Sequence, residues 1–151
     1  GEGVKNKKTE LVSNGVLKTW ILNTATAQKL NLKSTGHASR SIGAPPGTGT
    51  NNLFMANGII SYKDILDSAK KGFYATELIG MGVNLVTGDF SVGASGYWIE
   101  NGEKVFPVSE VTIASNLTEM FLNLSAANDL EFKYGTNAPT RGIEGMTLAG
   151  K

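Results

Sequence analysis

The sequence predicts an α+β fold: a mixed, largely antiparallel β-sheet with β-hairpins and three short helices. Two Asn-Gly pairs, at residues 14–15 and 101–102, each separate two β-rich runs, and this pair suits the positive φ angles of a type I′ hairpin turn. Three capping signals precede short runs with helical spacing, at Asn23 or Thr24, at Ser61 and at Asn116. No regular alternation of strands and helices appears, which argues against a parallel α/β sheet.

The first third of the chain predicts a hairpin, a helix and a loop. The hairpin runs over residues 9–13 and 16–22, and the helix extends from the cap to Leu32. Residues 34–52 are almost entirely small or polar, with Arg40 the only charge, so we expect a long surface loop that is functional or mobile. A short strand is expected at residues 52–56.

In the middle of the chain, Ser61 and Asp64 have the spacing of a capping box. The apolar residues that follow have helical spacing, Lys70 and Lys71 suit the end of a helix, and Gly72 is expected to stop it. A strand over 73–79, a glycine-punctuated stretch over 80–96, a hairpin over 97–108 and an alternating run over 110–114 come next.

The last part of the chain predicts a third helix and two strands. Asn116 caps the helix, with Glu119 at its third position. The two strands are expected at residues 130–134 and 143–149, on either side of a turn rich in Gly, Asn and Pro.

Composition excludes several classes of function. The chain has 151 residues, no Cys, one His, and 14 Lys and Arg against 13 Asp and Glu. This charge balance argues against a basic surface that binds nucleic acid or a membrane, and no apolar run approaches the roughly 20 residues of a membrane span. We therefore expect a soluble single domain over residues 1–151. An ordinary hydrophobic core would bury roughly 70% of the surface of the unfolded chain, and the aromatic residues, Trp20 and Trp98 among them, are expected to line it.

Three weaker patterns each have a functional interpretation and an ordinary structural one. Residues 44–51 look like a phosphate-binding loop, but Thr50 stands where the Lys must be, so a flexible surface loop is favoured. His37 is a candidate acid or base, although a lone loop histidine is more often a bystander. Glu77 and Asp89 sit among apolar and Gly residues, where a buried carboxylate has to be satisfied. The structural alternative is that these carboxylates accept hydrogen bonds from backbone N–H groups of the glycine-rich turns.

One long block is more distinctive than any short motif. It comprises TELIGMGVN (76–84), TGDFS (87–91), GASGYWIENGE (93–103), PVSEVTIA (107–114) and NDL (128–130). The segments GEG (1–3), VLKTW (16–20), AQKL (27–30), KSTGHA (33–38) and IEGMTLAG (143–150) fit as well. Together they strongly resemble the C-terminal domain of the TldD/PmbA family, and specifically its PmbA (TldE) type. We therefore expect a fragment of a longer chain.

The resemblance implies a bacterial or archaeal cytoplasmic peptidase system, in which TldD-type and PmbA-type subunits pair into a zinc metallopeptidase that trims peptides and unfolded chains. In that family an HExxxH helix of the TldD-type subunit and a late Cys hold the metal. Neither is present here, since residues 134–141 read YGTNAPTR, although an HExxxH would lie upstream of residue 1. The resemblance thus implies no catalytic residue, no metal and no cofactor in this chain, with zinc only in a TldD-type partner.

Two interpretations of function follow from these observations. In the first, the chain forms a dimer, with a TldD-type subunit or a second copy, and part of a cleft for an extended peptide or unfolded chain. Glycines at residues 80–96 would let a peptide strand approach, and Asn84, Thr87 and Asp89 would orient its polar groups or, alternatively, brace turns. In the second, the chain is a protein-interaction domain of the DNA gyrase modulator type without a peptidase role.

Overall fold

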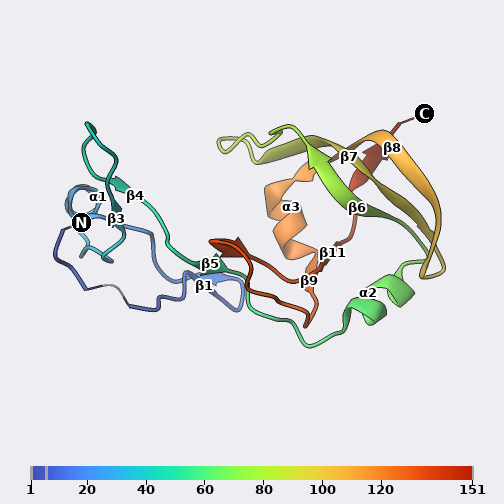
Figure 1. The fold of residues 1–151 in the computed structure, drawn as a ribbon, viewed down its shortest axis with the longest axis horizontal. Coiled ribbons are helices and arrows are strands. Elements are labelled where there is room, and N and C mark those ends of the chain that lie inside the picture. Colours follow the sequence, from blue (N-terminus) through green and yellow to red (C-terminus); the bar gives the residue numbers. More distant parts are fainter. Residues whose placement is uncertain (1, 6, 151) are drawn as a thin grey trace. The chain divides into compact units, whose positions relative to one another are not determined.

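The structure, a computed structural model, describes residues 2–5 and 7–150, so Gly1 of the GEG segment lies outside the described residues. The chain divides into two units, one of residues 1–53 and 134–136 and the other of residues 54–133 and 137–151. The expectation of one domain over residues 1–151 stays a prediction, because units of one chain can unfold together or separately. Three short helices and mostly antiparallel strands confirm the α+β class (Figure 1).

The first unit contains two small hairpins and one helix. β1 (Val12–Ser13) pairs antiparallel with β2 (Val16–Leu17), and φ angles of 49° at Asn14 and 74° at Gly15 confirm the predicted turn. Helix α1 (Thr24–Lys29) begins after Asn23, whose Oδ1 accepts a hydrogen bond from Thr26 N at 2.8 Å. The helix therefore has the predicted start and ends before Leu32.

The segment predicted as one long loop, residues 34–52, is partly ordered as a hairpin. Its strands β3 (Ala38–Ser39) and β4 (Gly47–Thr48) pair antiparallel. Asn23 Nδ2 donates to the carbonyl oxygens of Pro46 and Gly47 at 2.8 and 3.2 Å. A side chain from the helix cap thus supplies polar partners that the loop's own composition did not reveal.

A four-stranded antiparallel sheet organises the second unit, in the order β12–β8–β7–β6 (Figure 1). Its strands are β6 (Lys71–Ile79), β7 (Asp89–Glu100), β8 (Glu103–Asn116) and β12 (Thr147–Ala149). The predicted Asn101–Gly102 turn, with φ angles of 50° and 81°, joins β7 to β8. The run predicted separately at 110–114 continues β8, which is therefore a single long strand.

β6 is an edge strand of this sheet, because in the described residues it pairs with β7 alone. Its ladder is interrupted once. Ala75 pairs with Gly96 and Glu77 with Ser95, so Thr76 has no partner residue and forms a β-bulge. The Thr76 hydroxyl donates instead to Ser95 O at 3.1 Å.

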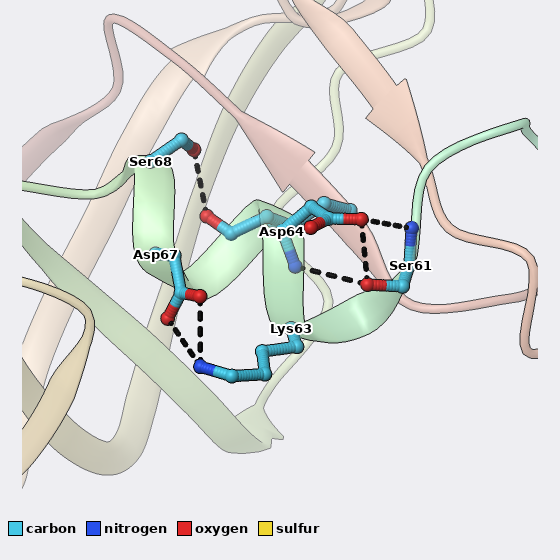
Figure 2. Close-up of polar contacts among 6 residues, drawn as sticks. Ser61, Lys63, Asp64, Asp67 and Ser68 are labelled. Carbon is cyan, nitrogen blue, oxygen red and sulfur yellow. Dashed lines mark hydrogen bonds and ion pairs between the residues drawn. The ribbon is translucent and has the colours of Figure 1, made fainter.

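Helix α2 (Tyr62–Ser68) has the predicted capping box (Figure 2). Ser61 Oγ accepts from Asp64 N at 3.1 Å, and the Asp64 carboxylate accepts from Ser61 N at 2.9 Å. The Ser61 hydroxyl also donates to Asp64 Oδ2 at 2.7 Å, and this bond, followed by the one from Ser61 N, favours the charged carboxylate and lowers the pKa of Asp64. Lys63 and Asp67 add an ion pair one turn apart at 2.7 Å.

The predicted end of this helix was wrong. The helix ends at Ser68, and Lys71 and Gly72 already belong to β6. The backbone N–H groups of Asn101 and Gly102 donate to the carbonyl oxygens of Lys70 and Ala69 at 2.9 and 3.0 Å. The hairpin turn therefore takes the carbonyl groups that one more helical turn would have used.

The remaining elements are short. β5 (Leu53–Phe54) pairs with β10 (Thr136–Asn137), β9 (Leu124–Ala126) pairs with β11 (Arg141–Ile143), and α3 (Leu117–Leu122) begins after the predicted cap Asn116. The strand predicted at 130–134 is absent from the described structure. Leu130 N donates to Asn57 Oδ1 and Lys133 N to Asn137 Oδ1, each at 2.8 Å, so side-chain oxygens replace a strand ladder. The strand predicted at 143–149 divides between β11 and β12, with Gly145 at φ 78° between them.

The prediction of an ordinary hydrophobic core was wrong. The chain exposes 11,100 Å², against about 7,400 Å² for a compact monomer of this mass and roughly 8,800 Å² for two separate compact units. Folding therefore hides only about half of the unfolded surface. Seven apolar residues are buried in the described chain: Leu22, Ala27, Val92, Ala94, Ile99, Val111 and Ala127.

The aromatic residues do not form the expected core. Trp20 is 57% exposed and Phe121 is 69% exposed. Trp98 stacks on Phe106 with the ring centroids 6.5 Å apart, but Phe106 remains exposed on the sheet. The second unit thus has sheet and helix surfaces whose apolar side chains its own chain leaves uncovered.

Two glycines allow β7 to lie close to its surroundings. A Cβ atom at Gly96 of β7 would lie 1.9 Å from Tyr74 O of β6, and one at Gly82, in the segment between β6 and β7, would lie 1.5 Å from Ser91 O of β7. Real Cβ atoms do not approach backbone atoms so closely, so a side chain at Gly96 would push β6 from β7, and one at Gly82 would push the connecting segment from β7.

We predict that Gly96→Ala lowers the free energy of unfolding by about 2 kcal/mol, because the new methyl group has to displace the β6 backbone. Urea unfolding followed by circular dichroism measures the effect. Gly47→Ala is the matched control, since a Cβ there has no heavy atom within 4 Å. Equal stability of the two variants would contradict this account of the sheet.

Candidate functional site

The connection between β6 and β7 brings the three predicted site residues together. Asn84 and Thr87 lie in the turn of residues 80–88, and Asp89 is the first residue of β7. Asn84 N donates to Asp89 O at 2.8 Å, and Gly88 N donates to Asn84 O at 2.8 Å. Backbone hydrogen bonds therefore hold the three residues together in one turn.

The side chains of the three residues interact mainly with their own turn. Asn84 Oδ1 accepts from Val86 N at 3.0 Å and from Thr87 N at 3.3 Å, which is an Asx-type arrangement. The Thr87 hydroxyl donates to Asp89 Oδ2 at 2.6 Å. These bonds favour the bracing role for Asn84 and Thr87. Peptide binding by the three residues stays a prediction.

Residues at the junction of β8 and α3 also form hydrogen bonds with this turn. Asn116 Nδ2 donates to Thr87 O at 3.0 Å, and Leu117 N donates to Gly88 O at 2.7 Å. Gly88 has a φ of 81°, and a Cβ there would lie 3.0 Å from Asn116 Nδ2. The cap of α3 and the turn before β7 are therefore one hydrogen-bonded assembly.

The glycines of this region serve the sheet itself. The space that a side chain would need at Gly82 and Gly96 is filled by the backbone of Ser91 and Tyr74. Gly96 thus provides close contact between β6 and β7, and Gly82 between the turn and β7, so their positions add no support to the approach of a peptide strand.

Sequence reasoning missed the apolar character of the turn. Met81, Leu85 and Val86 are 102%, 86% and 95% exposed, and we call these three residues the apolar turn. Leu78 and Ile79, at the end of β6, are half exposed. The sequence predicts one glycine-punctuated stretch over residues 80–96, whereas β6 ends at Ile79 and Gly80, with a φ of 91°, begins the turn.

The acidic residues singled out in the sequence lie on the strands of the four-stranded sheet. Glu77 and Asp89 are both exposed, so the expectation of carboxylates that need satisfying in a buried environment was wrong. Their strand positions explain this, because Glu77 lies on the edge strand and Asp89 starts β7. Glu100 and Glu103 face each other across the hairpin turn, and Glu100 Oε1 accepts from Trp98 Nε1 at 3.1 Å.

Two other sequence candidates have structural roles. His37 is half-buried, and its Nδ1 lies 2.8 Å from Thr35 Oγ1. Thr35 Oγ1 also bonds to the backbone of Leu22. In the segment 44–51, the carbonyl oxygens of Pro46 and Gly47 accept from Asn23, which differs from a phosphate loop, where backbone N–H groups face the ligand.

The described side chains offer no set of zinc ligands of their own. The sequence contains no Cys and a single His, and the residues that the structure describes include no group of three or more His, Cys, Asp or Glu side chains able to hold a metal ion. Zinc in proteins takes three or four such ligands around one point. Among the described residues, no helix is long and apolar enough to span a bilayer.

Comparison with known protein families gives one match over residues 1–150, to the family described as the PmbA/TldA metallopeptidase C-terminal domain. Among curated proteins, the chain is 38% identical over 151 residues to Metalloprotease PmbA of Escherichia coli O157:H7, covering 99% of this chain and 32% of that protein. It is 30% identical over 152 residues to a Metalloprotease TldD homolog of Buchnera aphidicola, covering 99% and 30%.

Solved structures give the same fold. TldE from Thermococcus kodakarensis matches with a TM-score of 0.85 and 26% identity over 98% of this chain and 35% of that one. A Thermotoga maritima protein described as a candidate modulator of DNA gyrase matches with a TM-score of 0.82 and 33% identity over 97% and 34%. The chain therefore spans about one third of the length of the relatives it matches.

We predict that Asn84→Ala loosens the turn, because the Val86 and Thr87 N–H groups lose their acceptor. Loss of a net hydrogen bond of about 1 kcal/mol corresponds to roughly fivefold faster amide exchange there. Hydrogen–deuterium exchange of the peptide spanning residues 84–89 measures this. Asn84→Asp keeps the acceptor oxygen and should exchange like the parent protein. Unchanged exchange in Asn84→Ala would refute the bracing role.

Proposed function

The chain belongs to the PmbA/TldD family, whose C-terminal domain it matches over residues 1–150, and on that basis we propose that it is the C-terminal domain of a PmbA/TldE-type subunit. The whole assembly would be a TldD–TldE-like zinc metallopeptidase that processes or degrades peptides and unfolded chains. This chain would be non-catalytic and would contribute a dimer interface and part of a peptide-binding cleft. The observation that carries the proposal is the 38% identity to Metalloprotease PmbA over 99% of this chain.

The small choice of metal-binding side chains supports a non-catalytic role. A zinc ion that activates water needs three protein ligands held around it, and the described residues offer no such group. Identity is also higher to Metalloprotease PmbA, at 38%, than to the TldD homolog, at 30%. Zinc and the groups that activate water are therefore assigned to a TldD-type partner.

The uncovered apolar surface supports a role in assembly. The exposed area exceeds that of two separate compact units by about 2,300 Å², which is on the scale that one side of a large obligate interface buries. The apolar turn and Phe121 and Leu122 of α3 are among the most exposed apolar residues of the second unit. We assign this surface to contacts with a TldD-type subunit, or with a second copy in a homodimer.

The open edge of β6 supports the peptide-binding part of the proposal. An extended peptide can add to an exposed sheet edge through backbone hydrogen bonds, and β6 pairs on one side alone in the described chain. Asp89 is exposed at the start of β7 and bonds to Thr87 through one carboxylate oxygen. Its other oxygen would accept a hydrogen bond from a peptide.

The proposed setting is the cytoplasm, without nucleic acid or membrane as partners. A formal net charge of +1 gives no concentrated positive field for phosphate groups. The second candidate function is a protein-interaction domain without a peptidase role, favoured by the likeness to a protein described as a candidate gyrase modulator. Affinity purification separates the two, since the first requires a TldD-type subunit in the complex.

We predict that the full-length protein purified alone contains no stoichiometric zinc and hydrolyses no peptide, and that activity appears when a TldD-type subunit is added. Metal content by mass spectrometry and cleavage of an unfolded casein chain are the measurements. Adding a chelator to the mixture should abolish cleavage. Stoichiometric zinc together with cleavage by the protein alone would refute the non-catalytic assignment.

We predict that Asp89→Asn raises KM for peptides about threefold and leaves kcat unchanged in the assembled enzyme. The substitution removes a charged hydrogen-bond acceptor, and solvent exposure keeps its contribution small. Glu144→Gln, which removes an exposed charge elsewhere in the second unit, is the control. The same KM for both variants and the parent enzyme would argue against a role of Asp89 in binding.

A further inference from the structure

Three tyrosines and one lysine form a cluster on one face of the four-stranded sheet. The Lys104 ammonium, from β8, lies 3.6 Å from the centroid of the Tyr74 ring on β6 and 5.8 Å from the Tyr97 ring on β7. It also lies 5.8 Å from the ring of Tyr62, the first residue of α2. The Lys104 side chain therefore extends across the central strand to the edge strand.

The charge of Lys104 has no carboxylate partner in the described residues, where the ion pairs are Lys63–Asp67 and Lys133–Glu131. Interaction with the Tyr62 hydroxyl is the main cause that raises the pKa of Lys104, so its ammonium stays protonated at neutral pH. Tyr62 and Tyr74 contact each other edge to face, with centroids 6.1 Å apart. The aromatic rings thus hold a cation in one place without neutralising it.

Lys104 and Tyr97 are both exposed to solvent, and Tyr74 lies on the strand whose other side is open. Side chains of a peptide added to β6 alternate between the two faces of the sheet. Every second one would therefore project over the face that carries this cluster.

We propose that Lys104, Tyr62 and Tyr74 form a carboxylate-binding site that selects acidic peptide segments at the β6 edge. The ligand is a carboxylate group, either of a Glu or Asp side chain or of a peptide C-terminus. Lys104 supplies the cation and the tyrosine hydroxyl groups supply further donors. Because the rings already restrict the lysine, little side-chain freedom is lost on binding. The proposal rests on the proposed peptide-binding function and adds its specificity.

The test measures binding of three matched peptides to the full-length protein in complex with a TldD-type subunit inactivated by chelation. All three are N-acetylated heptapeptides of alternating Val and Thr. One has a central Glu and an amidated C-terminus, one has a central Gln and a free C-terminal carboxylate, and one has a central Gln and an amidated C-terminus. Fluorescence anisotropy of labelled peptides gives the affinities.

We expect the parent protein to bind one or both carboxylate peptides about threefold to fivefold more tightly than the neutral peptide, as for an exposed ion pair. Lys104→Gln should abolish this preference and leave affinity for the neutral peptide unchanged. Lys70→Gln, which removes the same charge from the exposed lysine that directly precedes β6, should keep it. The peptide that gains affinity identifies the source of the carboxylate.

Three results would overturn the inference. Equal affinity of the parent protein for all three peptides would refute it and leave the peptide-binding function standing. An equal loss for all three peptides in Lys104→Gln would show that the cluster only fastens α2 to the sheet. If none of the peptides binds, both this site and the proposed peptide binding are wrong.

Discussion

The close contact of β7 with its two neighbours is the constraint on which the rest of the second unit depends. β7 pairs along most of its length with β6 on one side and β8 on the other. Gly96 leaves no room for a side chain against the backbone of Tyr74 on β6, and three of the buried apolar residues, Val92, Ala94 and Ile99, are on this strand. The hairpin turn, the end of α2 and the turn before Asp89 are all fixed by hydrogen bonds at the ends of this ladder.

Local signals in the sequence predicted their structures well. The Asn-Gly turns and the capping residues Asn23, Ser61 and Asn116 depend on atoms a few residues apart. Signals that depend on distant partners failed. The end of α2 is decided by Asn101 and Gly102, and the strand expected at 130–134 is replaced by bonds to Asn57 and Asn137. No local pattern contains those partners.

The predicted site shows the same division. The proximity of Asn84, Thr87 and Asp89 could be predicted because they belong to one short turn. The exposure of Met81 and Val86 could not, since apolar residues between glycines look the same whether they are covered or not. The aromatic residues misled for a similar reason: their type indicates burial, but what covers them need not be in the same stretch of chain. This chain spans about one third of its relatives' length, so it contains only part of the surface that could cover such residues.

The bulge at Thr76 also bears on how the protein avoids self-association. An open edge strand is a template for pairing with identical strands, and long regular edges lead to cross-β aggregates. The bulge divides the β6 edge into the segments 71–75 and 77–79, and a straight strand cannot stay in register across both. The exposed charges of Lys71 and Glu77 border these segments and disfavour stacking of copies. The edge can therefore admit a short strand while resisting the growth of a fibril.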